Sequence, residues 1–138
     1  MKKFLTTLLV VWSLVFASTS QAAIETYTGE GTATSGDSET MAQVVERAKL
    51  YAKKNALEQS AIYIQYRTTA KVEFVDDELV SDEAGVLKVV GKPIIERNLL
   101  GGGDALQVHV TLTAEIDTDA LQRELDKLIN KRNSKPVR

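Results

Sequence analysis

Strict alternation of apolar and polar residues marks two segments of the chain as half-buried strands. The segment 24–34 alternates, and the face that we expect to be buried carries mostly small residues: Tyr27, Gly29, Gly31 and Ala33. Because two glycines leave that face nearly bare, the pattern predicts the close approach of a packed helix. The segment 105–116 alternates with larger residues, and its expected inward set is Leu106, Val108, Val110, Leu112, Ala114 and Ile116.

Steps of three and four residues predict two helices. The first is expected to begin at Asp37 or Ser38, whose side chains can accept hydrogen bonds from the free amides of a first turn. Its apolar stripe is rich in alanine and suited to lying close to a sheet: Met41, Val44, Val45, Ala48, Tyr51, Ala52 and Ala56. The second is expected to be capped by Asp117, Thr118 or Asp119 and to bury Leu121, Leu125, Leu128 and Ile129.

Two further segments have the composition of strands. Residues 61–75 are rich in β-branched and aromatic side chains and alternate, which predicts a long strand, bent near Thr69. Residues 86–100 are also predicted to be a strand, and Pro93 places it at a sheet edge or a bulge because proline cannot donate to the ladder. Residues 81–85 predict a short helical turn, and the glycine-rich residues 101–104 predict a hairpin loop.

The order of these elements predicts an α+β fold. We expect a mainly antiparallel sheet of about four strands, with the long helix of the N-terminal half and the C-terminal helix packed on one face. The length of 138 residues and a hydrophobic content of 43% suit one globular domain, which we place at residues 23–130. Residues 131–138 hold four cations and Pro136, and we expect this basic tail to be disordered.

The first 22 residues have the organisation of an export signal. Lys2 and Lys3 precede the apolar run 4–16, and the small residues 17–22 follow, with cleavage expected after Ala22. The run is shorter than the ~20 residues that span a bilayer, so we expect no stable membrane span after cleavage. The predicted location is the periplasm, with release from the cell left open. The absence of cysteine excludes disulfides, thiol chemistry and a lipid-bearing cysteine.

Charge and residue types leave little room for catalysis or nucleic-acid binding. Cleavage would remove Lys2 and Lys3 and leave 15 basic against 19 acidic groups, a net charge of −4, whereas nucleic-acid binders are basic. His109 is the one histidine, and its place on the polar face of a strand favours an exposed or hydrogen-bonded residue over a general base. We therefore expect no enzyme and no cofactor. A glycan hydrolase with paired carboxylates stays open as the last alternative.

One acidic cluster has the chemistry of a calcium site. It consists of Asp76, Asp77, Glu78, Asp82 and Glu83. Their spacing does not match an EF-hand loop, and a run of charges is usually a solvated surface, so the sequence favours an acidic loop without metal. A small-ligand or calcium-binding protein using residues 76–83 is the main alternative function.

Four stretches carry a resemblance to known proteins: ERAKLYAKKNAL at residues 46–57, the following EQSAIYIQ, then LVSDEAGVLKVV, and VHVTLTAEIDTDALQREL. Together they resemble an exported bacterial envelope domain, that of the small outer-membrane lipoprotein family and of the N-terminal domain of flagellar assembly protein T. The resemblance implies an α+β module of envelope or flagellar-ring assembly, with no known reaction and no cofactor. The lipid-bearing cysteine of the lipoproteins is missing here.

These observations lead to the hypothesis of a non-enzymatic periplasmic module for binding or assembly. Its partner would be an envelope protein or a second copy of the chain. Strand addition is the expected mode, at the strand with Pro93 or at the glycine-containing first strand. The polar sheet face supplies further candidate contact residues, namely Thr26, Thr28, Glu30, Gln107, His109 and Thr111.

Overall fold

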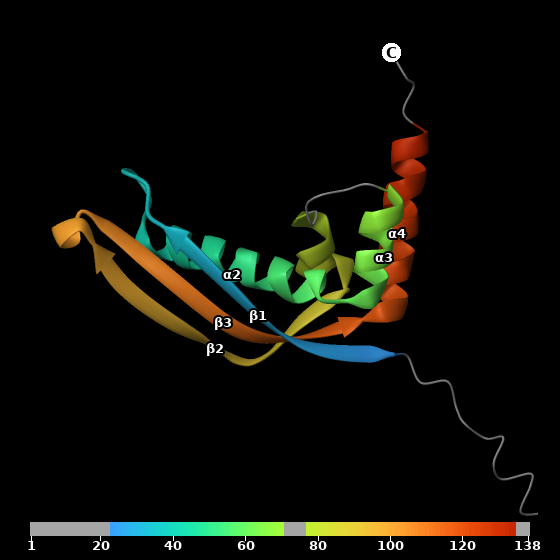
Figure 1. Cartoon of the computed structure of the whole chain (residues 1–138), viewed down its shortest axis with the longest axis horizontal. Helices are drawn as coiled ribbons and strands as arrows, with labels where there is room; N and C mark the ends of the chain where they lie inside the picture. Colours follow the sequence, from blue (N-terminus) through green and yellow to red (C-terminus); the bar gives the residue numbers. More distant parts are fainter. Residues whose placement is uncertain (1–22, 71–76, 135–138) are drawn as a thin grey trace, which may run out of the picture.

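A three-stranded antiparallel sheet is the centre of the fold (Figure 1). The computed structural model describes residues 23–70 and 77–134. Its helices and strands follow in the order β1 (Ile24–Thr34), α2 (Met41–Glu58), α3 (Ala61–Ala70), β2 (Leu87–Leu100), β3 (Ala105–Asp117) and α4 (Thr118–Asn133). In the sheet the order is β1-β3-β2, so β1 and β2 are both edge strands. The α+β class is confirmed, whereas the described residues contain three strands and not about four.

The glycines of β1 let α2 lie almost against the backbone of the sheet. A Cβ atom at Gly29 would overlap the carbonyl oxygen of Ala52 and come within 2.9 Å of the Ala56 Cβ. A Cβ atom at Gly31 would overlap the carbonyl oxygen of Ala48. The alternation predicted for β1 and its close contact with an alanine-rich helix are therefore confirmed.

Helix α2 begins later than the sequence suggested. Thr40 is its N-cap, and its side chain accepts from the Gln43 amide at 3.3 Å while the Gln43 side chain accepts from the Thr40 amide at 2.9 Å. This reciprocal pair satisfies two amides at once, so a start at Asp37 or Ser38 is wrong. The predicted stripe is buried from Val44 to Ala56, with the exception of Tyr51, which is 40% exposed. Met41, in the first turn, is 53% exposed.

The strand predicted over residues 61–75 is wrong for residues 61–70, which form helix α3; residues 71–75 lie outside the described part. Ile62, Tyr66 and Thr69 share the side of α3 that faces α4, at helical and not at alternating spacing. The Thr69 hydroxyl donates to the carbonyl of Gln65 at 2.9 Å, as threonines inside helices do. Packing against α4 thus overrides the β propensity of this segment.

Strand β2 is irregular at Pro93, as predicted. Val90 pairs with Thr113 and Ile94 with Thr111, so β2 has two residues more than β3 between these points. Gly91, with φ of 71°, lies in this bulge. Two 3-10 turns, η1 (Asp77–Val80) and η2 (Asp82–Ala84), precede β2. After β2, the 3-10 turn η3 (Gly101–Gly103) and Asp104 form the predicted hairpin loop that leads into β3.

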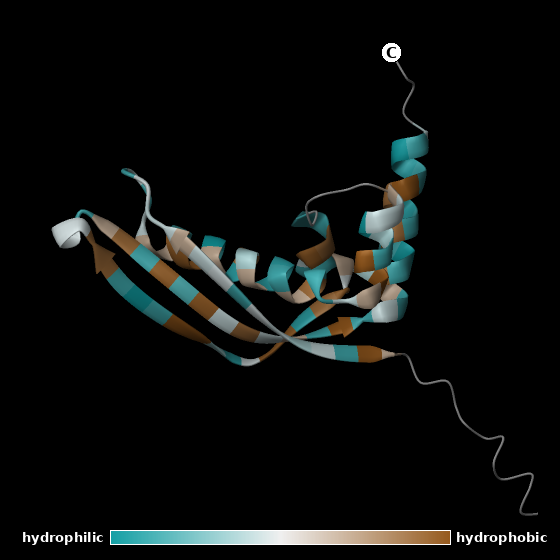
Figure 2. Cartoon of the chain, in the orientation of Figure 1, coloured by the Kyte–Doolittle hydropathy of each residue, from teal (hydrophilic) through white to brown (hydrophobic). Residues whose placement is uncertain are grey.

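Strand β3 and helix α4 carry most of the predicted core. The alternation along β3 is visible as bands in Figure 2, and every second residue from Val108 to Ile116 is buried. Asp117 caps α4 by accepting from the amides of Asp119 and Ala120 at 3.0 and 3.1 Å. Helix α4 packs against α3 beyond the end of β3, and does not lie along the sheet as α2 does (Figure 1). Its last three residues, 131–133, belong to the tail that we expected to be disordered; residues 135–138 lie outside the description, as does the predicted signal.

Candidate functional site

The sheet has an open face on the side away from α2. All six polar residues predicted to contact a partner lie on this face: Thr26, Thr28 and Glu30 on β1, and Gln107, His109 and Thr111 on β3. In the register only Glu30 and Thr111 lie opposite each other; Thr26 and Thr28 lie toward one end of the strand pair, and Gln107 and His109 toward the other. The predicted residues therefore share one face of the sheet and are spread along its length, and their role in a contact stays a prediction.

His109 is hydrogen-bonded on this open face. Its Nδ1 lies 2.7 Å from the Thr32 hydroxyl and its Nε2 lies 3.5 Å from a carboxylate oxygen of Glu30, both on β1. Glu96 of β2 is its register partner on the other side. The side chain thus links β1 to β3, which agrees with the prediction of a hydrogen-bonded residue.

The acidic cluster faces the lysines of α2. Asp77 forms an ion pair with Lys54, and Asp82 lies 4.0 Å from Lys53. Among residues 23–70 and 77–134, no group of three or more histidines and carboxylates is arranged for a metal ion, and Asp76 lies outside these ranges. Calcium binding by this loop stays the alternative to the acidic loop without metal that the sequence favours. The geometry gives Asp77 and Asp82 a part in holding η1 and η2 against α2.

Side chains of α2 and its C-cap cover the outer edge of β1, which is the edge that does not pair with β3. Gln59 donates to the Thr28 carbonyl at 2.7 Å, and the Glu30 amide donates to Asn55 Oδ1 at 3.0 Å. Arg47 donates to the Thr34 carbonyl at 2.6 Å. These contacts satisfy part of the ladder that a new strand would need, so β1 is a poor acceptor of another strand.

The same contacts reveal which backbone groups of β2 point outward. The backbone groups of Thr28 and Glu30 bond to side chains of α2 and its C-cap. The backbone amides and carbonyls of the even-numbered β1 residues therefore point away from the sheet, and those of the odd-numbered residues bond to β3. The alternation then directs the odd-numbered residues of β3 to β2, where they bond to Ile94, Glu96 and Asn98. The intervening residues of β2 are Ile95, Arg97 and Leu99. Their backbone amides and carbonyls point away from β3, toward the free side of the strand.

No hydrogen bond from elsewhere in the described chain reaches these three backbone positions. The two ends of this stretch are also apolar. Ile94 is 61% exposed and Leu99 is 72% exposed, and Ile95 and Leu100 stand beside them in the sequence. The edge from Ile94 to Leu100, here called the β2 edge, therefore combines unpaired backbone groups with exposed apolar side chains.

A groove lies between α2 and the first half of β2. Helix α2 covers β1 and β3 and contacts β2 far less. The groove has a volume of about 650 Å³. Both charged and apolar residues line it: Glu46, Lys49, Lys53, Asp82 and Lys88, and Gly85, Leu87, Val89, Pro93 and Leu112. Its β2 residues end at Pro93, so the groove lies beside the start of the β2 edge and not along it.

Sequence reasoning named the strand with Pro93 as a candidate edge but missed the residues that matter on it. Their signal is the loss of alternation after Pro93, where the apolar pairs Ile94–Ile95 and Leu99–Leu100 place apolar groups on both faces. The covering of β1 by Arg47, Asn55 and Gln59 has no signal in the sequence, because it depends on how α2 is placed.

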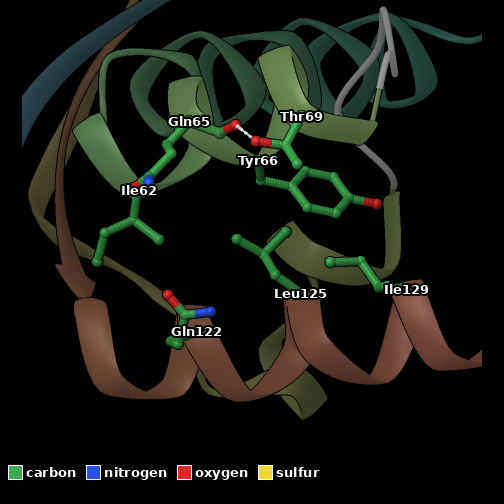
Figure 3. A pocket seen from close by; sticks show the side chains of 7 residues that line it. All are labelled: Ile62, Gln65, Tyr66, Thr69, Gln122, Leu125 and Ile129. Carbon is green, nitrogen blue, oxygen red and sulfur yellow. Dashed lines mark hydrogen bonds between the residues drawn. The ribbon is translucent and has the colours of Figure 1, made fainter.

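A smaller space lies between α3 and α4 (Figure 3). Its volume of about 190 Å³ is below the ~300 Å³ at which ligand pockets usually begin. Apolar and amide side chains line it: Ile62, Gln65, Tyr66, Thr69, Gln122, Leu125 and Ile129. No carboxylate, histidine or basic side chain is among these lining residues.

No helix of the described residues is long and apolar enough to span a membrane. No protein-family model matches the chain, and neither a curated protein nor a solved structure does. The resemblance to envelope and flagellar proteins therefore stays a prediction.

Proposed function

We propose that this chain is a non-enzymatic binding module of the bacterial cell envelope that accepts an extended segment of a partner as a fourth strand beside β2. The observation that carries the proposal is the difference between the two edges. Side chains of α2 and its C-cap bond to the edge of β1, whereas Ile95, Arg97 and Leu99 present unpaired backbone groups among exposed apolar side chains.

The β2 edge has the length that strand addition needs. An antiparallel segment opposite Ile95, Arg97 and Leu99 would exchange about six backbone hydrogen bonds with it. Its side chains would cover Ile94 on the open face and Leu99 on the α2 side. Pro93 limits the segment at one end because it has no amide to donate, and the hairpin loop limits it at the other.

The cellular setting of the proposal rests on the sequence. The charged start, the apolar run and the small residues before Ala22 are typical of an export signal, which supports a periplasmic location. The resemblance to envelope and flagellar assembly proteins supports an envelope protein as the partner. The polar open face, with His109 and its neighbours, would extend the contact beyond the new strand.

A site-specific photo-crosslinker tests the proposal in the cell. Placed at Leu99, it is expected to give a discrete periplasmic adduct. Placed at Glu58 of α2, beside the covered edge of β1, it is expected to give none. Arg97→Pro removes an outward amide without breaking the ladder to β3, so it should abolish the Leu99 adduct in a chain that still folds by circular dichroism. Equal adducts from both edges, or an adduct that survives Arg97→Pro, would contradict strand addition at β2.

A further inference from the structure

We infer that the β2 edge recognises a segment with an acidic residue opposite Arg97 and a basic residue opposite Glu96, and therefore binds a different protein and not a second copy of this chain. The inference rests on the proposed strand addition and specifies the chemistry of its partner. It follows from where two charged side chains lie at the edge.

Arg97 and Glu96 point to opposite faces of the sheet. Arg97 is in register with the buried Val108, on the α2 side, and stands between Ile95 and Leu99 on that face. Glu96 is in register with His109, on the open face, and stands between Ile94 and Asn98. In the part of the chain that the structure describes, neither side chain forms an ion pair.

An incoming antiparallel strand would place one side chain directly opposite each of these groups. Opposite charges across two strands are stabilising and like charges are destabilising. The complement of the edge, read along the incoming strand from the residue opposite Leu100 to the one opposite Ile94, is apolar, apolar, polar, acidic, basic, apolar and apolar. The apolar ends cover the exposed side chains, and the charged pair fixes the register.

The β2 edge is not its own complement. Two copies of the β2 edge would pair antiparallel about a two-fold axis perpendicular to the sheet. The unpaired backbone groups of one copy must lie opposite those of the other, so the axis has to pass at the level of a residue, which is then opposite its own copy. An axis at Arg97 would oppose two arginines, and an axis at Glu96 would oppose two glutamates. An axis at Ile95 would set Arg97 opposite Pro93, which has no amide, and one at Asn98 would set both charges opposite leucines. Each of these self-pairings therefore loses charge or hydrogen-bond complementarity.

Two peptides of identical composition test the inference. The matched peptide is Ile-Val-Thr-Glu-Lys-Val-Ile and the swapped peptide is Ile-Val-Thr-Lys-Glu-Val-Ile, each between Ser-Gly spacers. Binding to the exported chain is measured by fluorescence anisotropy. The matched peptide is expected to bind about three- to tenfold more tightly, because the swap turns two favourable cross-strand pairs into unfavourable ones while net charge and hydrophobicity stay equal.

A charge-reversed chain supplies the second half of the test. In the double variant Glu96→Lys, Arg97→Glu the preference is expected to reverse, so that the swapped peptide binds more tightly. Glu58→Lys, a charge reversal at an exposed position of α2 beside β1, is the matched control and should leave the preference of the parent chain unchanged.

The outcomes separate this inference from the proposed function. Equal binding of the two peptides would overturn the charge recognition and leave strand addition standing. A concentration-dependent dimer of the chain that Arg97→Pro abolishes would place a second copy at the edge and would likewise overturn the inference. Failure of both peptides to bind the parent chain and the charge-reversed chain would contradict strand addition itself.

Discussion

Two glycines of β1, Gly29 and Gly31, set the distance between the sheet and α2. Gly31 has the carbonyl oxygen of Ala48 and the backbone nitrogen of Ala52 where a side chain would begin. Because these are backbone atoms, Gly31→Ala can be accommodated only by moving the helix. We expect the variant to lose about 1–3 kcal/mol of unfolding free energy in urea titrations.

The matched control for this substitution is Thr28→Ala, which changes an exposed residue of the same strand. It should stay within about 0.5 kcal/mol of the parent chain. If Gly31→Ala were as stable as Thr28→Ala, the close contact between β1 and α2 would be wrong.

Tyr27 makes the stability of the fold depend on pH in the alkaline range. Its hydroxyl donates to a Glu25 carboxylate oxygen at 2.5 Å, and this bond, followed by burial and the nearby negative charge, raises the pKa of Tyr27 above its ordinary value of 10.0. A raised pKa means that the fold favours the neutral phenol, so its contribution is complete below pH 10.0 and is lost as the pH rises above that value. Urea titrations of the parent chain should show this loss, and Tyr27→Phe should show less of it. An identical alkaline loss in both chains would refute the role of Tyr27.

At the scale of elements, the start of α2 depends on Thr40. Its side chain and that of Gln43 satisfy each other's backbone amides, so Thr40→Ala is expected to cost about 1 kcal/mol of unfolding free energy. Ser38→Ala, at the start that the sequence suggested, should have little effect because Ser38 lies outside the helix and is exposed. Thermal or urea unfolding of the two variants decides between the two starts, and a larger loss for Ser38→Ala would contradict the structure.

The elements that could be predicted are those whose burial follows one regular period. β1 and β3 alternate against a single helix-covered face, and α2 buries one stripe, so their patterns were sufficient. Helix α3 could not be predicted in this way. Its Ile62, Tyr66 and Thr69 have β propensity, and only their packing against α4 makes them helical, which is a contact between segments far apart along the sequence.

At the scale of the whole molecule, the proposed function depends on an asymmetry between the two edges of the sheet. Both edge strands could be named from glycine and proline in the sequence, and the six polar candidates do share the open face. Which edge is free could not be predicted, because it depends on Arg47, Asn55 and Gln59 reaching the backbone of β1. Those contacts arise only once α2 lies across the sheet.

Amide hydrogen exchange followed by NMR tests this asymmetry most directly. In the free chain, the amides of Ile94, Glu96 and Asn98 should exchange slowly because they bond to β3, while those of Ile95, Arg97 and Leu99 should exchange rapidly. A peptide that adds as a fourth strand should then protect the second set. Slow exchange of Ile95, Arg97 and Leu99 in the free monomer would mean that the β2 edge is already covered, and would contradict its role as the binding site.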